Sequence, residues 1–174
     1  MLGGSGGMGR FAVRAALTFD GITEIVVADL NAEGAKAFIE SAAIAELAQQ
    51  ASIPLRSVGC DVTDGVSLRA AMSGVDVVLN STGPYFRFGV LVLSAAIECR
   101  IHYIDICDDW EPTLEMLNLH EAAEAAGVTC VVGLGASPGS TNLLGVAAMQ
   151  ELDECDTLFL GWDAGAALPA LETT

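Results

Sequence analysis

The residues with the clearest chemical potential are the glycines at the start of the chain. Gly4, Gly6 and Gly9 have the spacing Gly-x-Gly-x-x-Gly, and apolar residues follow them at helical intervals. Glycine permits a tight turn and a close backbone approach, and the amino end of a helix offers free N–H groups and a partial positive charge. The stretch therefore predicts a loop that binds the pyrophosphate of a dinucleotide, formed by Gly4, Ser5, Gly6, Gly7, Met8 and Gly9.

An acidic residue follows the glycines at the distance expected for a carboxylate that binds the ribose of a dinucleotide. Residues 23–29 have the pattern of a buried parallel strand, and Asp29 follows Gly9 by 20 residues. An acid at this distance accepts hydrogen bonds from a ribose and repels a 2′-phosphate. Asp29 could instead cap the next helix, but Asn31 fills that role better. We therefore expect the cofactor to be NAD or NADP, with NAD preferred.

Two further segments are placed to line the same cofactor. Asp61 and Val62 follow a short predicted strand and could contact the adenine, although for Asp61 a purely structural place in the turn is equally open. We assign Asp64 to capping the next helix. In the strand order 3-2-1-4-5-6, the loop after the fourth strand faces the glycine loop. The nicotinamide half is therefore expected to meet Asn80, Ser81, Thr82, Gly83 and Pro84.

Catalytic and metal-binding residues are harder to identify. Asp105 and Tyr85 are candidates for a catalytic acid or base by their location alone. The five cysteines include no Cys-x-x-Cys pair and the chain has two histidines, so we expect no metal site. The cysteines are expected to be reduced thiols of a cytosolic protein.

The pattern of elements along the chain predicts an α/β fold. Helices are expected at residues 32–50, 65–72, 89–99 and 113–126 and from after 142 to 149, and strands at 23–29, 55–58, 75–80, 101–105, 128–132 and 157–162. This alternation is typical of a Rossmann-type doubly wound parallel sheet. Because only Met1 and Leu2 precede the glycines, the first strand is expected to be truncated. We expect residues 1–150 to form an NAD(P)-binding domain and 151–174 to begin a new unit.

The composition argues against several kinds of partner. The chain has 23 acidic and seven basic residues and a net charge of −16, so a nucleic acid is not expected to bind. No apolar run approaches the roughly 20 residues of a membrane span, and no signal peptide is visible. We therefore expect a cytoplasmic protein with no membrane partner. Its acidic surface either keeps it soluble or adapts it to high salt.

Taken in order, six segments resemble the NAD(P)-binding half of the saccharopine dehydrogenase-like family. They are residues 3–9, 27–29, 60–64, 80–85, 102–105 and 137–142. The resemblance implies a Rossmann domain followed by a substrate and dimerisation domain, of which residues 151–174 would be the start and the rest is missing. It implies hydride transfer at a C–N bond of a small substrate derived from an amino acid or a polyamine. It also implies a homodimer.

Two alternatives accompany this interpretation. Gly3, Gly7 and Gly9 also fit Gly-x-x-x-Gly-x-Gly, the loop of short-chain dehydrogenases. That chemistry needs a Tyr-x-x-x-Lys pair, and the single lysine, Lys36, follows no tyrosine at this spacing. The alternative that stays open is a non-catalytic or truncated dinucleotide-binding module.

Overall fold

Strands and helices alternate in the computed structural model, which describes residues 1–161. The strands are β1 (Ile25–Asp29), β2 (Leu55–Gly59), β3 (Val77–Asn80), β4 (His102–Asp105) and β5 (Cys130–Val131). The helices are α1 (Gly7–Ala16), α2 (Ala32–Glu40), α3 (Ala42–Ala51), α4 (Gly65–Met72), α5 (Tyr85–Glu98), α6 (Trp110–Leu117), α7 (His120–Ala126) and α8 (Ser140–Gln150). The α/β class predicted from the sequence is confirmed.

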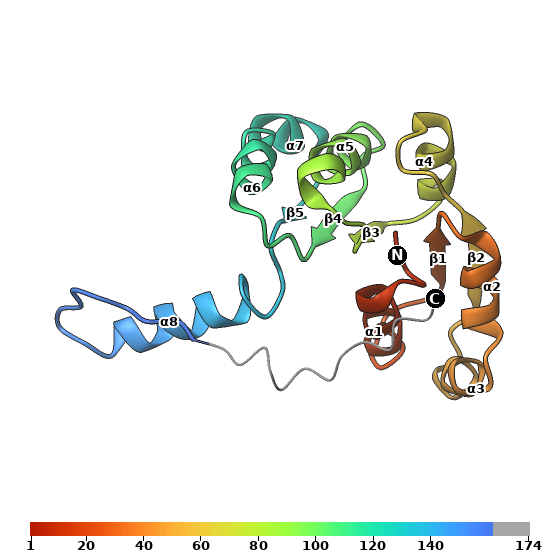
Figure 1. The fold of residues 1–174 in the computed structure, drawn as a ribbon, viewed down its shortest axis with the longest axis horizontal. Helices are drawn as coiled ribbons and strands as arrows, with labels where there is room; N and C mark the ends of the chain where they lie inside the picture. Colours follow the sequence, from red (N-terminus) through yellow and green to blue (C-terminus); the bar gives the residue numbers. More distant parts are fainter. Residues whose placement is uncertain (162–174) are drawn as a thin grey trace.

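Leu2 joins the two halves of the parallel sheet. β1 pairs with β2, and β3 pairs with β4, which pairs with β5. Leu2 bridges Ala28 of β1 and Asn80 of β3, so the order is β2-β1-Leu2-β3-β4-β5 (Figure 1). This is the doubly wound order 3-2-1-4-5-6 with a single residue in the place of the first strand. Below Leu2, a cavity of about 290 Å³ extends between the amino ends of β1 and β3.

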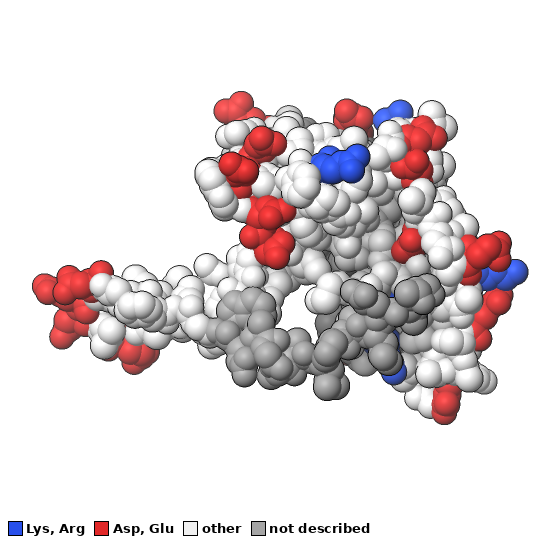
Figure 2. All heavy atoms as spheres, viewed as in Figure 1, with Lys and Arg blue, Asp and Glu red and all other residues white. Residues whose placement is uncertain are grey.

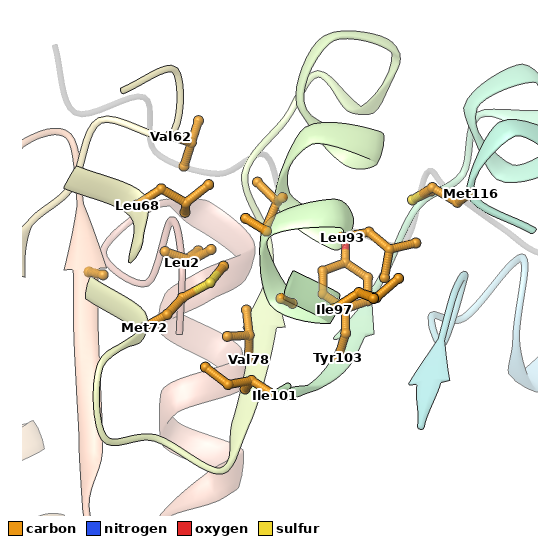
Figure 3. Packing of buried hydrophobic residues seen from close by; sticks show 14 of the residues in the cluster. Leu2, Val62, Leu68, Met72, Val78, Leu93, Ile97, Ile101, Tyr103 and Met116 are labelled. Atoms are coloured by element: carbon orange, nitrogen blue, oxygen red, sulfur yellow. The ribbon is translucent and has the colours of Figure 1, made fainter. Parts of the chain in front are cut away.

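Helices cover both faces of this sheet, as expected for parallel strands. Ile25 and Val27 of β1 pack in a cluster with α1, α2 and α3, whereas Ala28 belongs to the cluster under α4 and α5. Successive strand residues face opposite sides, so one short strand serves both clusters. Figure 3 shows Leu2 beside Leu68 and Met72 of α4 in the larger cluster.

Two long helices predicted from the sequence are each divided in the structure. The helix expected at 32–50 breaks at Ser41, whose backbone is extended (φ −61°, ψ 140°) and whose hydroxyl donates to the Phe38 carbonyl at 2.7 Å. The helix expected at 113–126 begins earlier, at Trp110, and is interrupted between α6 and α7. There, the Asn118 N–H is shared between the carbonyls of Leu114 and Glu115, which ends the first helix.

Other boundaries differ as well. α5 begins at Tyr85, before the expected start at residue 89, with Pro84 at its N-cap position. The strand expected at 157–162 is wrong over residues 157–161, which lie outside helix and strand, while residue 162 lies outside the described residues. Leu158 and Leu160 lie against Gly145 of α8. Within residues 1–161, no strand pairs with this segment. Figure 1 shows α8 extending away from the sheet.

Candidate functional site

The glycine loop connects Leu2 to α1 at the carboxyl end of the sheet. Its turn is closed by a bond of 3.0 Å from the Gly6 N–H to the Gly3 carbonyl, and Gly3 has a φ of +66°. Gly9 packs against Gly3 so closely that a Cβ on Gly9 would overlap the Gly3 carbonyl oxygen. No side chain caps the amino end of α1. The first N–H groups of this helix are therefore available to an anion.

The loop after β3 forms the opposite wall. The Ser81 hydroxyl donates to the Leu2 carbonyl at 2.9 Å, with the Gly3 carbonyl 3.2 Å away, and the Ser81 N–H also donates to Leu2. Thr82 lies beside the glycine loop, since a Cβ on Gly3 would be 3.1 Å from Thr82 Oγ1. This Oγ1 is buried and has no hydrogen-bond partner among residues 1–161. A buried unpaired hydroxyl is costly, and a ligand oxygen between the two loops would satisfy it.

Asp29 lies at the carboxyl end of β1 and faces the glycine loop. One carboxylate oxygen accepts the Ser5 N–H at 3.1 Å, and the other accepts the Asn31 N–H at 3.1 Å. Asn31 caps α2 as predicted, because its side-chain oxygen accepts the Gly34 N–H at 2.9 Å. Asp29 is therefore not used as the cap, and its half-buried carboxylate stands at the edge of the loop.

These segments surround a cavity of about 430 Å³ at the carboxyl edge of the sheet. Its volume is in the range of small-molecule sites, and it lies where the winding of the sheet reverses, which is the usual place for a ligand in this architecture. The buried Val62 and the half-buried Phe88 contribute apolar surface that an adenine could contact. The full lining is Leu2, Gly3, Ala28, Asp29, Leu30, Cys60, Asp61, Val62, Thr63, Thr82, Gly83 and Phe88.

Asp61 and Asp64 have different local roles. The carboxylate of Asp61 accepts both the hydroxyl and the N–H of Thr63, at 2.7 and 2.9 Å, and these bonds lower its pKa below the ordinary value. Asp61 is exposed at the edge of the cavity. Asp64 accepts the Val66 N–H at 2.9 Å and so caps α4, as predicted.

A buried polar network connects β3 and β4. The side-chain amide of Asn80 donates to the Tyr103 hydroxyl at 3.1 Å, and this hydroxyl donates to Asp105 at 2.8 Å. The other oxygen of Asp105 accepts the N–H groups of Cys107 at 3.0 Å and Gly133 at 2.7 Å. Asn80 and Asp105 are both fully buried. Asp105 therefore connects β4 with the loops that follow β4 and β5.

Neither candidate for a catalytic acid or base lines the cavity. Asp105 is occupied by the network described above, and the Tyr85 hydroxyl donates to the Asn80 carbonyl at 2.8 Å. Burial, followed by the negative charge of Asp105, raises the pKa of Tyr85. The same two causes raise the pKa of Tyr103, a partner that sequence reasoning missed. Asn80 pairs in register with Asp105, so aligned polar residues at two strand ends were the available signal.

The remaining surface is acidic. Figure 2 shows carboxylates distributed over several elements, with few basic side chains among them. Residues 1–161 contain no group of three or more His, Cys, Asp or Glu side chains that could hold a metal ion. No helix in this part of the chain is long and apolar enough to cross a membrane.

Comparison with known proteins agrees with this geometry. The sequence model of the saccharopine dehydrogenase NADP binding domain matches residues 1–131. A carboxynorspermidine synthase of Vibrio alginolyticus is 25% identical over 169 residues, which cover 89% of this chain and 40% of the relative. Apo saccharopine dehydrogenase (L-Glu forming) from Saccharomyces cerevisiae has the same fold, with a TM-score of 0.65 and 23% identity over 86% of this chain and 30% of the yeast chain. The chain spans less than half the length of both proteins and belongs to the family of the saccharopine dehydrogenase NADP binding domain.

Proposed function

We propose that this chain binds a nicotinamide dinucleotide for hydride transfer at a C–N bond of a small substrate derived from an amino acid or a polyamine. The observation that carries the proposal is the pairing of two loops around one cavity, with uncapped N–H groups on one wall and the unpartnered Thr82 hydroxyl on the other. The substrate class is suggested by the family and by the named activity of the Vibrio alginolyticus relative.

Each part of the dinucleotide has a matching group in the site. The N–H groups of residues 7–9 would hold the pyrophosphate, and Asp29 would accept hydrogen bonds from the adenosine ribose. The adenine would lie in the cavity against Val62, and the loop of residues 80–84 would meet the nicotinamide half. When bound, the cofactor supplies the hydride chemistry, and the protein positions it. Asn80 supports this loop from inside, because its side-chain oxygen accepts the Thr82 N–H at 3.0 Å.

The same geometry supports a second candidate, a dinucleotide-binding module without chemistry of its own. Asp105 and Tyr85 are buried and held in hydrogen bonds within the sheet edge. A proton donor or acceptor for substrate would then have to come from elsewhere. A cytoplasmic homodimer acting on a small-molecule substrate remains our proposal for the enzyme, and the division of the chain near residue 150 remains a prediction.

Cofactor titration tests the proposal. NADH and NADPH are titrated into the full chain while nucleotide fluorescence or heat is measured. The Thr82→Val variant, which keeps the side-chain shape but removes the hydroxyl, should weaken binding without lowering the unfolding temperature. Failure of the unaltered chain to bind either nucleotide would refute the proposal. Binding without turnover of any candidate imine would favour the non-catalytic module.

A further inference from the structure

The Asn80 side chain connects the interior of the sheet with one wall of the proposed site. It is fully buried, and both ends of its amide are used. Its Nδ2 donates to the Tyr103 hydroxyl at 3.1 Å, and its Oδ1 accepts the N–H of Thr82 at 3.0 Å. If the amide were turned over, its NH₂ group would face the Thr82 N–H, which is also a donor. A single orientation of the Asn80 amide therefore satisfies both partners.

Tyr103 supplies the acceptor that this orientation requires. Its hydroxyl accepts from Asn80 and donates its own proton to Asp105 at 2.8 Å, and the whole side chain is buried. Without this hydroxyl, the buried NH₂ group of Asn80 would lose its acceptor, and an unpaired donor in the core is costly. Rotation of the amide toward another acceptor would release the Thr82 N–H. The Tyr103 hydroxyl therefore helps to hold the backbone of Thr82.

The backbone of Thr82 determines where its hydroxyl lies. This Oγ1 is buried beside the glycine loop and has no hydrogen-bond partner among residues 1–161. The preceding residue, Ser81, is bonded to the carbonyl of Leu2 through both its hydroxyl and its N–H. Ser81 thus holds the segment against the glycine loop, and Asn80 holds it against the sheet. The position of the Thr82 hydroxyl depends on both attachments.

We propose that Tyr103 is a positioning residue for the cofactor site, acting through the Asn80 amide on the Thr82 hydroxyl; the inference rests on the proposed function. Tyr103 does not line the cavity. Its hydroxyl fixes the direction of the amide, the amide fixes the Thr82 backbone, and this backbone presents the hydroxyl to a ligand oxygen. A hydroxyl that is already in place needs no ordering when the ligand binds, so the affinity for nucleotide depends on a residue outside the cavity.

Tyr85 provides a matched control on the same residue. Its hydroxyl is also buried and also bonds to Asn80, but it donates to the main-chain carbonyl at 2.8 Å. Tyr85→Phe therefore removes a comparable hydrogen bond and leaves the side-chain amide between Tyr103 and Thr82. Tyr103→Phe keeps the aromatic ring that fills the core, so both variants should fold.

The test is a double-variant cycle on nucleotide affinity. NADH and NADPH are titrated by calorimetry, below the unfolding temperature, into the unaltered chain, Tyr103→Phe, Thr82→Val, the variant with both changes, and Tyr85→Phe. We expect Tyr103→Phe and Thr82→Val each to weaken both nucleotides by about three- to tenfold, the effect of one hydrogen bond. The variant with both changes should bind no more weakly than Thr82→Val, because Tyr103 acts through that hydroxyl. Tyr85→Phe should keep an affinity close to that of the unaltered chain.

Amide hydrogen exchange of the nucleotide-free chain provides a second measurement. The Thr82 N–H should be protected in the unaltered chain and in Tyr85→Phe, and should exchange faster in Tyr103→Phe. Rapid exchange of this N–H in the unaltered chain would overturn the inference without any variant. So would additive losses of affinity in the cycle, unchanged affinity in Tyr103→Phe, or equal weakening by Tyr103→Phe and Tyr85→Phe. If the unaltered chain binds neither nucleotide, the proposed function fails instead.

Discussion

Asp105 provides the sharpest test of how the carboxyl edge of the sheet is held together. Its buried carboxylate accepts three hydrogen bonds, from the Tyr103 hydroxyl and from the N–H groups of Cys107 and Gly133. In Asp105→Asn, an amide oxygen can still accept the two backbone N–H groups. The new NH₂ group then faces the Tyr103 hydroxyl, which already accepts from Asn80 and is left without an acceptor for its own proton. The substitution therefore removes the charge-assisted hydrogen bond from Tyr103 to Asp105 and leaves the buried Tyr103 hydroxyl without an acceptor.

The magnitude follows from this count. A hydrogen bond to a charged group contributes about 1.5–3 kcal/mol, and relief from burying a charge offsets part of the loss, so we expect Asp105→Asn to destabilise the chain by about 1–2 kcal/mol. Asp105→Ala strands all three donors and should cost about 3–5 kcal/mol, which approaches the whole stability of a marginal domain. Tyr103→Phe strands the Asn80 amide and one oxygen of Asp105, for about 1–2 kcal/mol. When Tyr103→Phe is combined with Asp105→Asn, the two losses of stability should not add, because each variant alone already removes the hydrogen bond between Tyr103 and Asp105.

Urea unfolding followed by circular dichroism measures these differences. The control is Asp108→Asn, an exposed carboxylate in the same loop, which should change stability by less than about 0.5 kcal/mol. Because Asp105 does not line the cavity, Asp105→Asn should keep its affinity for the nucleotide. An Asp105→Asn midpoint equal to that of Asp108→Asn would refute the structural role. Loss of hydride transfer at unchanged stability would make Asp105 a catalytic residue instead.

Three further predictions follow from the glycine loop, Asp29 and the surface charge. Gly9→Ala should unfold at a clearly lower temperature because its Cβ overlaps the Gly3 carbonyl, whereas a Cβ at Gly7 meets nothing within 4 Å and Gly7→Ala should fold normally; equal melting temperatures would contradict this packing. In a calorimetric titration, Asp29→Asn should weaken the binding of NADH more than that of NADPH. The substitution removes the charged acceptor for the ribose hydroxyl of NADH, whereas for NADPH it also removes the repulsion between the carboxylate and the 2′-phosphate. Equal weakening of both nucleotides would argue against the ribose contact. Added NaCl should raise the unfolding temperature by screening a net charge of −16, and an unchanged midpoint would show that the carboxylates are too dispersed to matter.

The features that could be predicted from the sequence depend on local spacing. The distance from Gly9 to Asp29 is fixed by one helix and one strand, so both ends of this unit were placed correctly relative to each other. The sheet order followed from the same pattern, because parallel strands with crossover helices have few allowed arrangements. The strand expected at 157–162 had the right residue types but no neighbour among residues 1–161, and a strand exists only when paired.

The buried network could not be predicted in this way because it depends on register between strands. Asn80 and Asp105 are aligned only after β3 and β4 pair, and Gly133 reaches Asp105 only because β5 adds to the same edge. The breaks in the long helices could not be predicted either, for a local reason. Ser41 interrupts an alanine-rich run, and a single serine does not by itself mark a change of direction because serine occurs both inside helices and at their N-caps.

The preference between NAD and NADP is also difficult to predict from the spacing of residues along the sequence. Asp29 alone indicates NAD, since a carboxylate at the end of that strand repels a 2′-phosphate. Preference depends, however, on the sum of charges around the ribose, and the structure adds Arg10 from the helix after the glycine loop rather than from the strand end. The guanidinium is held by Phe38 and Ser5 and not by Asp29, so it is not neutralised by the carboxylate beside it. The Asp29 carboxylate and the Arg10 guanidinium contact the N–H and the carbonyl of Ser5, which belong to two successive peptide units, so both charges would contribute to the field around a ribose bound at this loop.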